Sequence, residues 1–434
     1  MQLVFGNINA HVSLQGLSED NMNFSLTSLG GVNLCNRGEV GFSVNYDGKS
    51  LCIMNDIIGG YHIYYWQIGK EVNISDDIYE VLVATGDFPI NSHEKRYFDR
   101  HGYGLADRTF REGLFRLPPS STLIVNEKGL RVESNWPLGE IDRTPDVRKY
   151  KEAVQQAVDD SLSQLLNSKK KIVLCFSGGK DSLYLAKRMQ DLGIDFDLVY
   201  WTISEEAQQT AERGAKLLGK NLIIMDVSDC NKELQSVIEN EMYFDHHYSR
   251  IHYVGCQAIV KRYGHEVILV NGQNSDSILT YGPSETKRTS YWKRYLMYGN
   301  SYIRKWIYKT IIELGFRRRF VIPQSYEDLN RSLLDNFKYC MILDKNEPTE
   351  YREYLNECIR KITQRTKFSN QNNLWMYIKT FTHIYGSDCQ VVTNSARHFE
   401  LDLLLPFSTE AFMRAALTFK DDQIELRHPK YALR

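Results

Sequence analysis

The sequence predicts an α/β fold in which a β-rich sandwich precedes a parallel-sheet domain with added helices. Three observations support this prediction. The first ~145 residues contain short β-type segments separated by turn residues. From Lys171 onward, strand-like and helix-like segments alternate. Beyond about residue 285 the chain reads mainly as helices. We therefore expect two domains, at residues 1–145 and 146–434.

The β-rich part is defined by runs of β-branched and aromatic residues, bounded by Gly, Asn, Asp and Pro. Those runs are GFSVNY (41–46), SLCIMND (50–56), YHIYYWQI (61–68), STLIVNE (121–127) and LRVESNW (130–136). A polar joint follows at 139–147. Helical spacing then begins at Tyr150, where apolar residues recur every three or four positions up to Leu166.

The second part alternates in a way that predicts a doubly wound parallel sheet. Its expected strands lie at 171–176, 196–202, 221–227 and 266–271, and its expected helices at 183–193, 207–218, 230–241 and 254–263. Ligands of such sheets bind beyond the carboxyl ends of the strands. Ser177 and Gly272 directly follow the first and fourth strands, so we expect a ligand between them.

Composition excludes several classes of protein. The chain has 434 residues, of which 42% are hydrophobic, and a net charge of -1, so no overall field favours nucleic acid as a partner. No signal peptide or membrane span is evident, and we expect no membrane association. The eight cysteines form no C-x-x-C pair. Scattered thiols are typical of a reducing cytosol, which predicts a cytoplasmic protein.

The segment Ser177-Gly178-Gly179-Lys180-Asp181-Ser182 carries the chemistry. Two glycines let the backbone approach phosphate, and successive N–H groups at a helix N-terminus form an anion site. Ser177 and Ser182 add hydroxyl donors. Asp181 would repel bare phosphate, so we expect it to hold Mg²⁺. The loop is shorter than G-x-x-x-x-G-K-S, which argues against a Walker NTPase. The alternative is a plain strand-to-helix turn.

SGGKDS resembles the signature of the ATP-pyrophosphatase superfamily, whose members cleave ATP between the α and β phosphates and transfer AMP. The segment 270–277, VNGQNSDS, resembles the G-E-G-S-D-E of asparagine synthetases and the G-Y-G-S-D of β-lactam synthetases. The resemblance implies that Asp276 is a second Mg²⁺ ligand and that Gly272 lies at the nucleotide. A polar Asn/Ser loop without such a role is the alternative.

Further matches extend this resemblance to the asparagine synthetase-like family, including lasso-peptide cyclases, with a degenerate class II glutamine amidotransferase-like N-terminal domain. The matching segments are Asn55–Tyr65 (D-x-x-G-x-x-P-L-Y-Y), Ile74–Asp77 (A-S-E), Phe115–Ser120 (G-I-x-x-L-P-P-G), Leu405–Phe407 (V-P-F) and Lys430–Arg434 (K-x-x-L-R). The family's lysine contacts pyrophosphate, which implies a catalytic role for Lys430.

Two departures from the family pattern affect the expected function. Glutamine-using members carry Cys after the initiator Met, whereas this chain has Gln2, so we expect no glutaminase activity. Gln273 stands where the family has Glu or Tyr. A glutamine cannot act as acid or base, but it can orient a reacting amine or acyl-adenylate. Phe176 and Trp201 are placed either to contact adenine or to pack in the core.

The sequence thus predicts an ATP- and Mg²⁺-dependent carbon–nitrogen ligase that adenylates a carboxylate and then transfers the acyl group to an amine. The alternatives are an enzyme acting on a nucleobase or deazapurine, and a non-catalytic ATP-binding relative. The basic, aromatic stretch 287–319 favours the former, unless it is a solvated amphipathic helix pair. Asp245-His246-His247 reads as a polar loop more readily than as a metal site. The possibility that the protein forms a homo-oligomer stays open.

Overall fold

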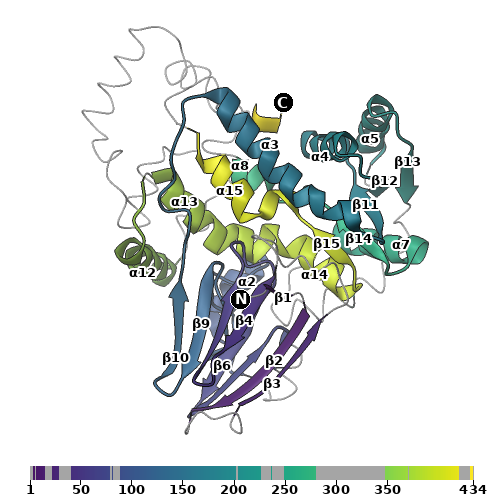
Figure 1. The fold of residues 1–434 in the computed structure, drawn as a ribbon. Coiled ribbons are helices and arrows are strands. Elements are labelled where there is room, and N and C mark those ends of the chain that lie inside the picture. Colours follow the sequence, from purple (N-terminus) through teal and green to yellow (C-terminus); the bar gives the residue numbers. More distant parts are fainter. Residues whose placement is uncertain are drawn as a thin grey trace.

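The computed structural model describes residues 3–4, 6–14, 22–28, 41–78, 81, 88–201, 204–225, 236, 249–279, 348–369, 371–419 and 431–433. Two antiparallel sheets and one parallel sheet organise these residues, together with helices that pack between and around them (Figure 1). The predicted α/β class is therefore confirmed. None of the described helices is long and apolar enough to cross a membrane.

The two antiparallel sheets form a sandwich. One has the strand order β1 (Leu3–Val4), β4 (Phe42–Tyr46), β5 (Ser50–Asn55), β9 (Ser121–Asn126) and β10 (Gly129–Ser134). The other has the order β3 (Met22–Ser28), β2 (Gly6–Ser13), β7 (Glu71–Ser75), β6 (Tyr64–Ile68) and β8 (Phe115–Arg116). Leu51 and Leu123 from the first sheet meet Val72 and Ile74 from the second in one buried cluster. All five strand segments expected here overlap observed strands.

A helix that the sequence analysis did not anticipate, α2 (Ser92–His101), interrupts the β-rich part. The Asn91 side chain caps it by accepting from the N–H groups of His93 and Glu94, and Gly102 ends it in the left-handed conformation at φ 80°. Tyr97 of α2 packs edge-on against Tyr351, with ring centroids 5.3 Å apart. This helix therefore links the sandwich to the helical part of the chain.

The parallel sheet has the order β13 (Leu222–Met225), β12 (Asp197–Trp201), β11 (Lys171–Cys175), β14 (Val267–Val270) and β15 (Asp402–Leu404). All of its pairings are parallel. The chain runs outward from β11 through β12 to β13 and then returns to β14 on the other side of β11. A topological switch point therefore lies between β11 and β14, where ligands of such sheets bind. The fifth strand, β15, was not expected.

Helices flank this sheet and fill the space between it and the sandwich (Figure 1). They are α3 (Val147–Ser163), η2 (Gln164–Asn167), α4 (Lys180–Asp191), α5 (Glu205–Leu217), α7 (Arg250–Tyr263), α8 (Ser275–Leu279), α12 (Thr349–Arg365), α13 (Gln371–Lys379), the π-helix η4 (Thr380–Asp388), α14 (Gln390–His398), η5 (Pro406–Ser408), α15 (Glu410–Leu417) and η7 (Tyr431–Leu433). The expected helix at 230–241 lies outside the described residues except for residue 236, and the stretch 280–347 lies wholly outside them.

The largest hydrophobic core is shared between the β-rich part and the rest of the chain. Ile58 and Tyr61, which follow β5, belong to the same buried cluster as Leu174 of β11 and Phe381 of η4. The segment that joins β10 to α3 is also fixed, because the Asn373 side chain donates to the carbonyl oxygens of Leu138 and Gly139, each at 3.0 Å. The predicted division near residue 145 stays a prediction, and the two parts pack against each other extensively.

Candidate active site

The glycine-rich loop follows β11 and leads into α4, as the sequence predicts. Gly178 has φ +68°, a left-handed backbone conformation that favours glycine. A β-carbon at Gly178 would come within 2.4 Å of the Thr210 carbonyl oxygen of α5. Both conditions require glycine at this position. The loop is therefore held tightly against α5.

Two hydroxyl groups hold the loop in shape. The Ser177 amide donates to Ser182 Oγ at 3.3 Å, and Ser182 Oγ donates to the Gly179 carbonyl at 3.2 Å. The Gly179 amide donates to Ser177 Oγ at 3.2 Å. Ser182 is buried, whereas Ser177 and Gly179 are exposed. The two serines thus shape the loop, because their hydroxyl oxygens accept from the amides of Ser177 and Gly179.

The N-terminus of α4 resembles an anion site in its geometry. Gly179 is the N-cap residue, and no side chain caps the helix there. The first-turn amides and the positive end of the helix dipole therefore face outward from the end of β11. Asp181 lies in the same first turn and is half-buried. A carboxylate there is suited to a cation that neutralises the phosphates.

The second predicted segment follows β14 and is anchored by its own polar side chains. The Asn271 amide donates to the Leu404 carbonyl of β15 at 3.0 Å, and the Gln273 amide donates to Asn271 Oδ1 at 2.9 Å. Asn274 has φ +70°, and its Nδ2 donates to Ser408 Oγ at 2.8 Å. The segment is thus a turn fixed by hydrogen bonds rather than an unstructured polar loop.

The structure brings the two predicted loops together. A β-carbon at Gly272 would lie 3.4 Å from the β-carbon of Asp181 and 3.6 Å from the Phe407 ring. The end of β14 therefore touches the first turn of α4, directly across the switch point. Asp276 follows one turn later, in the first turn of α8, and its side chain is exposed. Gln273 is half-buried between Gly272 and α8.

The two aromatic residues proposed to contact adenine are both buried. Phe176 is 2% exposed, and its ring lies against Gly214 of α5, where an added β-carbon would be 2.9 Å from Cζ. Trp201 is 7% exposed and lies against Gly255 of α7. Both side chains pack between the sheet and a helix in this structure. Contact with a base stays a prediction for each.

Cys175, at the end of β11, fits the core role expected of a thiol on a buried strand. Burial raises the pKa of this thiol to about 12. A neutral thiol beside the glycine loop is a poor nucleophile.

A group that the sequence analysis missed lies against the second loop. Ser277 of α8 donates a hydrogen bond to Asp388 Oδ2, and His383 Nε2 lies 3.2 Å from Asp388 Oδ1. Burial opposes the charged form of Asp388, but His383, the hydrogen bond from Ser277 and the charge of Lys379 together outweigh it and lower the pKa of that carboxyl. Asp388 is 111 residues from Ser277, and no local pattern marks it.

Some predicted features lie outside the described residues. These are Lys430, Gln2, the Asp245-His246-His247 triplet and the basic stretch 287–319. Tyr431, Ala432 and Leu433 are described, and Ala432 and Leu433 are buried in the main core beside α3 and α4.

The donor set fits a magnesium site built with a triphosphate rather than a complete protein cage. Among the described residues, no cluster of three or more His, Cys, Asp or Glu side chains could hold a metal ion alone. Mg²⁺ characteristically takes one or two protein carboxylates and completes its shell with phosphate oxygens and water. Asp181 and Asp276 lie in the first turns of α4 and α8, and their role as ligands of such an ion stays a prediction.

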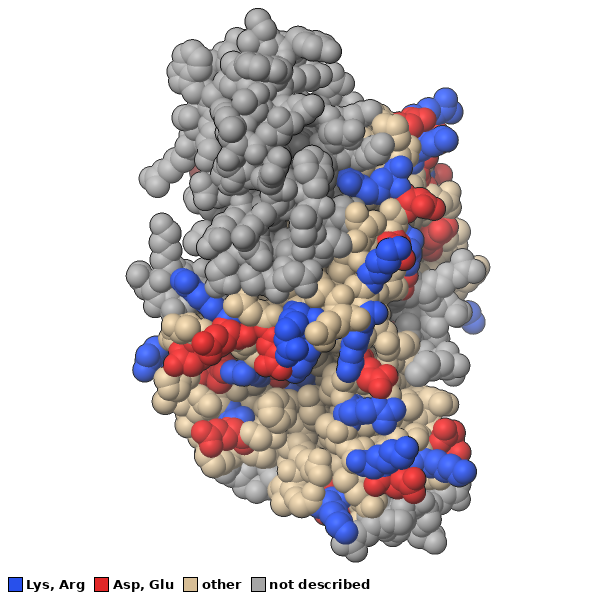
Figure 2. Space-filling model, turned by 90° about the vertical axis from the view of Figure 1, so that its left-hand side faces the viewer, with Lys and Arg blue, Asp and Glu red and all other residues tan. Residues whose placement is uncertain are grey.

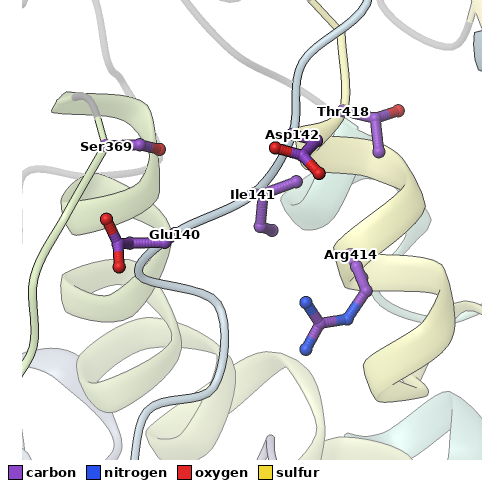
Figure 3. Close-up of a pocket in the computed structure, with 6 residues that line it drawn as sticks. All are labelled: Glu140, Ile141, Asp142, Ser369, Arg414 and Thr418. Carbon is purple, nitrogen blue, oxygen red and sulfur yellow. The ribbon is translucent and has the colours of Figure 1, made fainter.

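A separate surface pocket of about 400 Å³ lies beside the segment that connects β10 to α3. It is lined by Glu140, Ile141, Asp142, Ser369, Arg414 and Thr418. Figure 3 shows Arg414 extending from α15 into this space. No residue predicted for the active site lines it. Figure 2 shows acidic and basic side chains interspersed over the described part of one face, in keeping with the net charge of -1.

No protein-family model matches the chain. No curated protein matches it either. Among solved structures, it is similar to an NH3-dependent NAD synthetase from Campylobacter jejuni, with 17% identity over 49% of this chain and 94% of that chain and a TM-score of 0.22. It is also similar to the U34-tRNA thiolase NcsA from Methanococcus maripaludis, with 12% identity, 58% and 81% coverage, and a TM-score of 0.24.

A third similar structure is a glutamine phosphoribosylpyrophosphate amidotransferase from B. subtilis, with 12% identity over 42% of this chain and 31% of that chain and a TM-score of 0.13. At such TM-scores these similarities add nothing to the argument from strand order and loop geometry. The functional inference therefore rests on the residues themselves.

Proposed function

We propose that the chain is an ATP-dependent carbon–nitrogen ligase that adenylates a substrate carboxylate, releases pyrophosphate and transfers the acyl group to an amine. In this proposal residues 146–434 form the synthetase domain. Residues 1–145 form a retained amidotransferase-like domain without glutaminase activity. The resemblance of SGGKDS and NGQNSDS to asparagine synthetase-like enzymes supports the finer assignment.

One observation carries the proposal: Gly272 touches Asp181 across the switch point. This contact joins an uncapped helix N-terminus, which attracts phosphate, to a second loop that ends in an exposed carboxylate. The pair of loops offers a triphosphate both amide donors and two carboxylates for its cations.

In the proposed binding mode, the exposed loop around Gly179 and the first-turn amides of α4 hold phosphate oxygens. Ser177 and Ser182 fix the loop, so the amides are already oriented before ATP binds. Asp181 and Asp276 would hold Mg²⁺. When bound, that ion neutralises the phosphates and makes pyrophosphate a better leaving group. The main contribution of the protein is thus alignment and charge stabilisation.

The first half-reaction forms one bond and breaks one. A carboxylate oxygen of the substrate attacks the α-phosphorus, the bond from that phosphorus to the bridging β-phosphate oxygen breaks, and pyrophosphate leaves. We propose that Lys430 stabilises the leaving group, as the family resemblance implies. In the second half-reaction an amine attacks the acyl carbon, AMP leaves with the bridging oxygen, and the amine loses a proton. Gln273 would orient the amine or the acyl-adenylate by hydrogen bonds.

The test is MgATP binding by titration calorimetry, followed by carboxylate-dependent ATP–pyrophosphate exchange with amino acids and peptides as candidate substrates. We expect Asp181→Ala and Asp276→Ala to abolish exchange. Asp191→Ala is the matched control, because Asp191 ends the same helix in an exposed pair with Lys187. Exchange that survives in Asp181→Ala at the wild-type rate contradicts the magnesium assignment.

The same experiment separates the other candidate functions. Binding of MgATP without exchange for any carboxylate would favour a non-catalytic relative. Exchange stimulated by a nucleobase or by RNA, and not by carboxylates, would favour the enzyme that acts on a base.

A further inference from the structure

The hydrogen-bonded group formed by Ser277, His383 and Asp388 connects α8 to the π-helix η4. Each oxygen of the Asp388 carboxylate has its own partner: Oδ2 accepts from Ser277, and Oδ1 lies 3.2 Å from His383 Nε2. Because a carboxylate only accepts, His383 must carry its proton on Nε2 for this contact. The orientation of the carboxylate is therefore set from both sides.

The short helix α8 depends on anchors of this kind. It has five residues, Ser275–Leu279, and a helix that short is unstable by itself. Ser275, Ser277 and Ile278 are buried, whereas Asp276 is exposed to solvent. At the start of α8, Asn274 is fixed to Ser408. In its middle, Ser277 is fixed to Asp388. Together with the burial of Ile278, these two hydrogen bonds hold in place the helix that carries Asp276.

The π-helix η4, which carries His383 and Asp388, is held in place by contacts with the β-rich part of the chain. The Tyr385 hydroxyl donates to the Leu117 carbonyl at 2.9 Å, and His62 Nε2 lies 3.2 Å from the Tyr385 carbonyl oxygen. Gly59, at φ +62°, lies directly against the Tyr385 ring. Asp388, three residues later on the same element, is therefore held at a fixed position relative to the β-rich part.

We propose that Asp388 is a positioning residue for the magnesium carboxylate Asp276, acting through the hydroxyl of Ser277. The inference rests on the proposed function, because it presumes that Asp276 binds the cation of MgATP. Groups that orient a metal ligand alter the affinity for the metal even though they never touch it. Asp388 also extends the proposed site to an element on which the sequence shows no motif.

Four variants test this inference, each measured by the Mg²⁺ dependence of ATP binding in calorimetry. Asp388→Asn keeps the shape of the side chain but removes one of the two acceptors. Ser277→Ala removes the hydroxyl without changing charge. We expect both to raise the Mg²⁺ concentration needed for half-maximal ATP binding by roughly 10- to 100-fold. His383→Gln, which retains a side-chain N–H donor, should raise it less than His383→Leu does.

The matched control is Asp402→Asn. Asp402 is a buried carboxylate paired with Lys170 at 2.9 Å. It is the first residue of β15 and so lies at the amino ends of the strands, opposite the proposed site. We expect this variant to lower thermal stability and to leave the Mg²⁺ requirement unchanged.

The outcomes distinguish the inference from the function on which it rests. A wild-type protein that binds no MgATP overturns both. A wild-type protein that binds MgATP, with Ser277→Ala and Asp388→Asn requiring no more Mg²⁺ than Asp402→Asn, overturns the role of Asp388 alone. If Asp388→Asn does not fold, Ser277→Ala decides the question, because it removes a single hydroxyl group.

Discussion

Substitution of Gly178 by alanine tests the link between the loop geometry and nucleotide binding. The new side chain would face two penalties. A left-handed backbone conformation costs an ordinary L-residue about 1–2 kcal/mol. In addition, its β-carbon would lie 2.4 Å from the Thr210 carbonyl oxygen, although real β-carbons essentially never approach a heavy atom closer than 3.0 Å. The loop must therefore move by at least 0.6 Å, the difference between those distances.

That displacement falls on the amides proposed to hold phosphate. Because a misplacement of about 1 Å can slow an enzymatic reaction by roughly 10²-fold, we expect Gly178→Ala to weaken MgATP binding and to slow ATP–pyrophosphate exchange by up to about 100-fold. The assay is titration calorimetry, with urea unfolding measured in parallel to follow stability.

Gly193→Ala is the matched control for this substitution. Gly193 follows α4, has φ +73°, and no atom lies within 4 Å of the position that a β-carbon would occupy. The Gly193→Ala variant should therefore lose stability from the backbone conformation alone and keep its affinity for MgATP. Equal affinities in the two variants would refute the reasoning that the loop after β11 forms the phosphate site.

Three further predictions concern the packing, the pH response and the amidotransferase-like part. Gly59→Ala should lower the free energy of unfolding by about 2–5 kcal/mol, because it combines a left-handed φ with a contact of 2.5 Å to the Tyr385 ring; Gly69→Ala, at φ +59° in open space, should lose only the backbone part. Burial lowers the pKa of His252 from 6.5 to about 4, so the unfolded chain binds the extra proton first, and stability should fall by ~3 kcal/mol as pH drops from 6.5 to 4. The free energy of unfolding of His252→Leu, measured by urea titration, should lack this part of the pH dependence. The same dependence on pH in the variant and the wild type would contradict the prediction. Finally, glutamine added to the protein should yield no glutamate in a coupled assay, and any steady release would refute our interpretation of Gln2.

Local pattern was sufficient for the parts of the fold in which neighbouring residues act together. The run before Ser177, the two glycines and the apolar face of α4 define a strand, a loop and a helix within about 20 residues. The position of Gly272 followed from the alternation of strands and helices, because parallel strands share a carboxyl edge. The contact between Gly272 and Asp181 was thus predictable from topology alone.

Features determined by distant contacts escaped prediction. β15 has only three residues, Asp402–Leu404, and its identity as a strand comes from pairing with β14. The π-helix η4 continues α13 without a sequence break, so periodicity could not separate the two. Asp388 is an ordinary aspartate until the fold brings it to Ser277. Trp201 could equally have faced a ligand or α7, since a strand offers both faces.

The strand β15 also has a consequence for how the protein is made. Asn271 and Asn274, which shape the loop after β14, are tied to Leu404 and Ser408, more than a hundred residues further along the chain. During synthesis on the ribosome, the first strands of the sheet emerge long before these partners do. The loop after β14, which belongs to the proposed nucleotide site, therefore lacks these partners in the nascent chain until residue 408 has left the exit tunnel. We therefore expect the yield of folded protein to depend on how long that incomplete sheet stays exposed during synthesis.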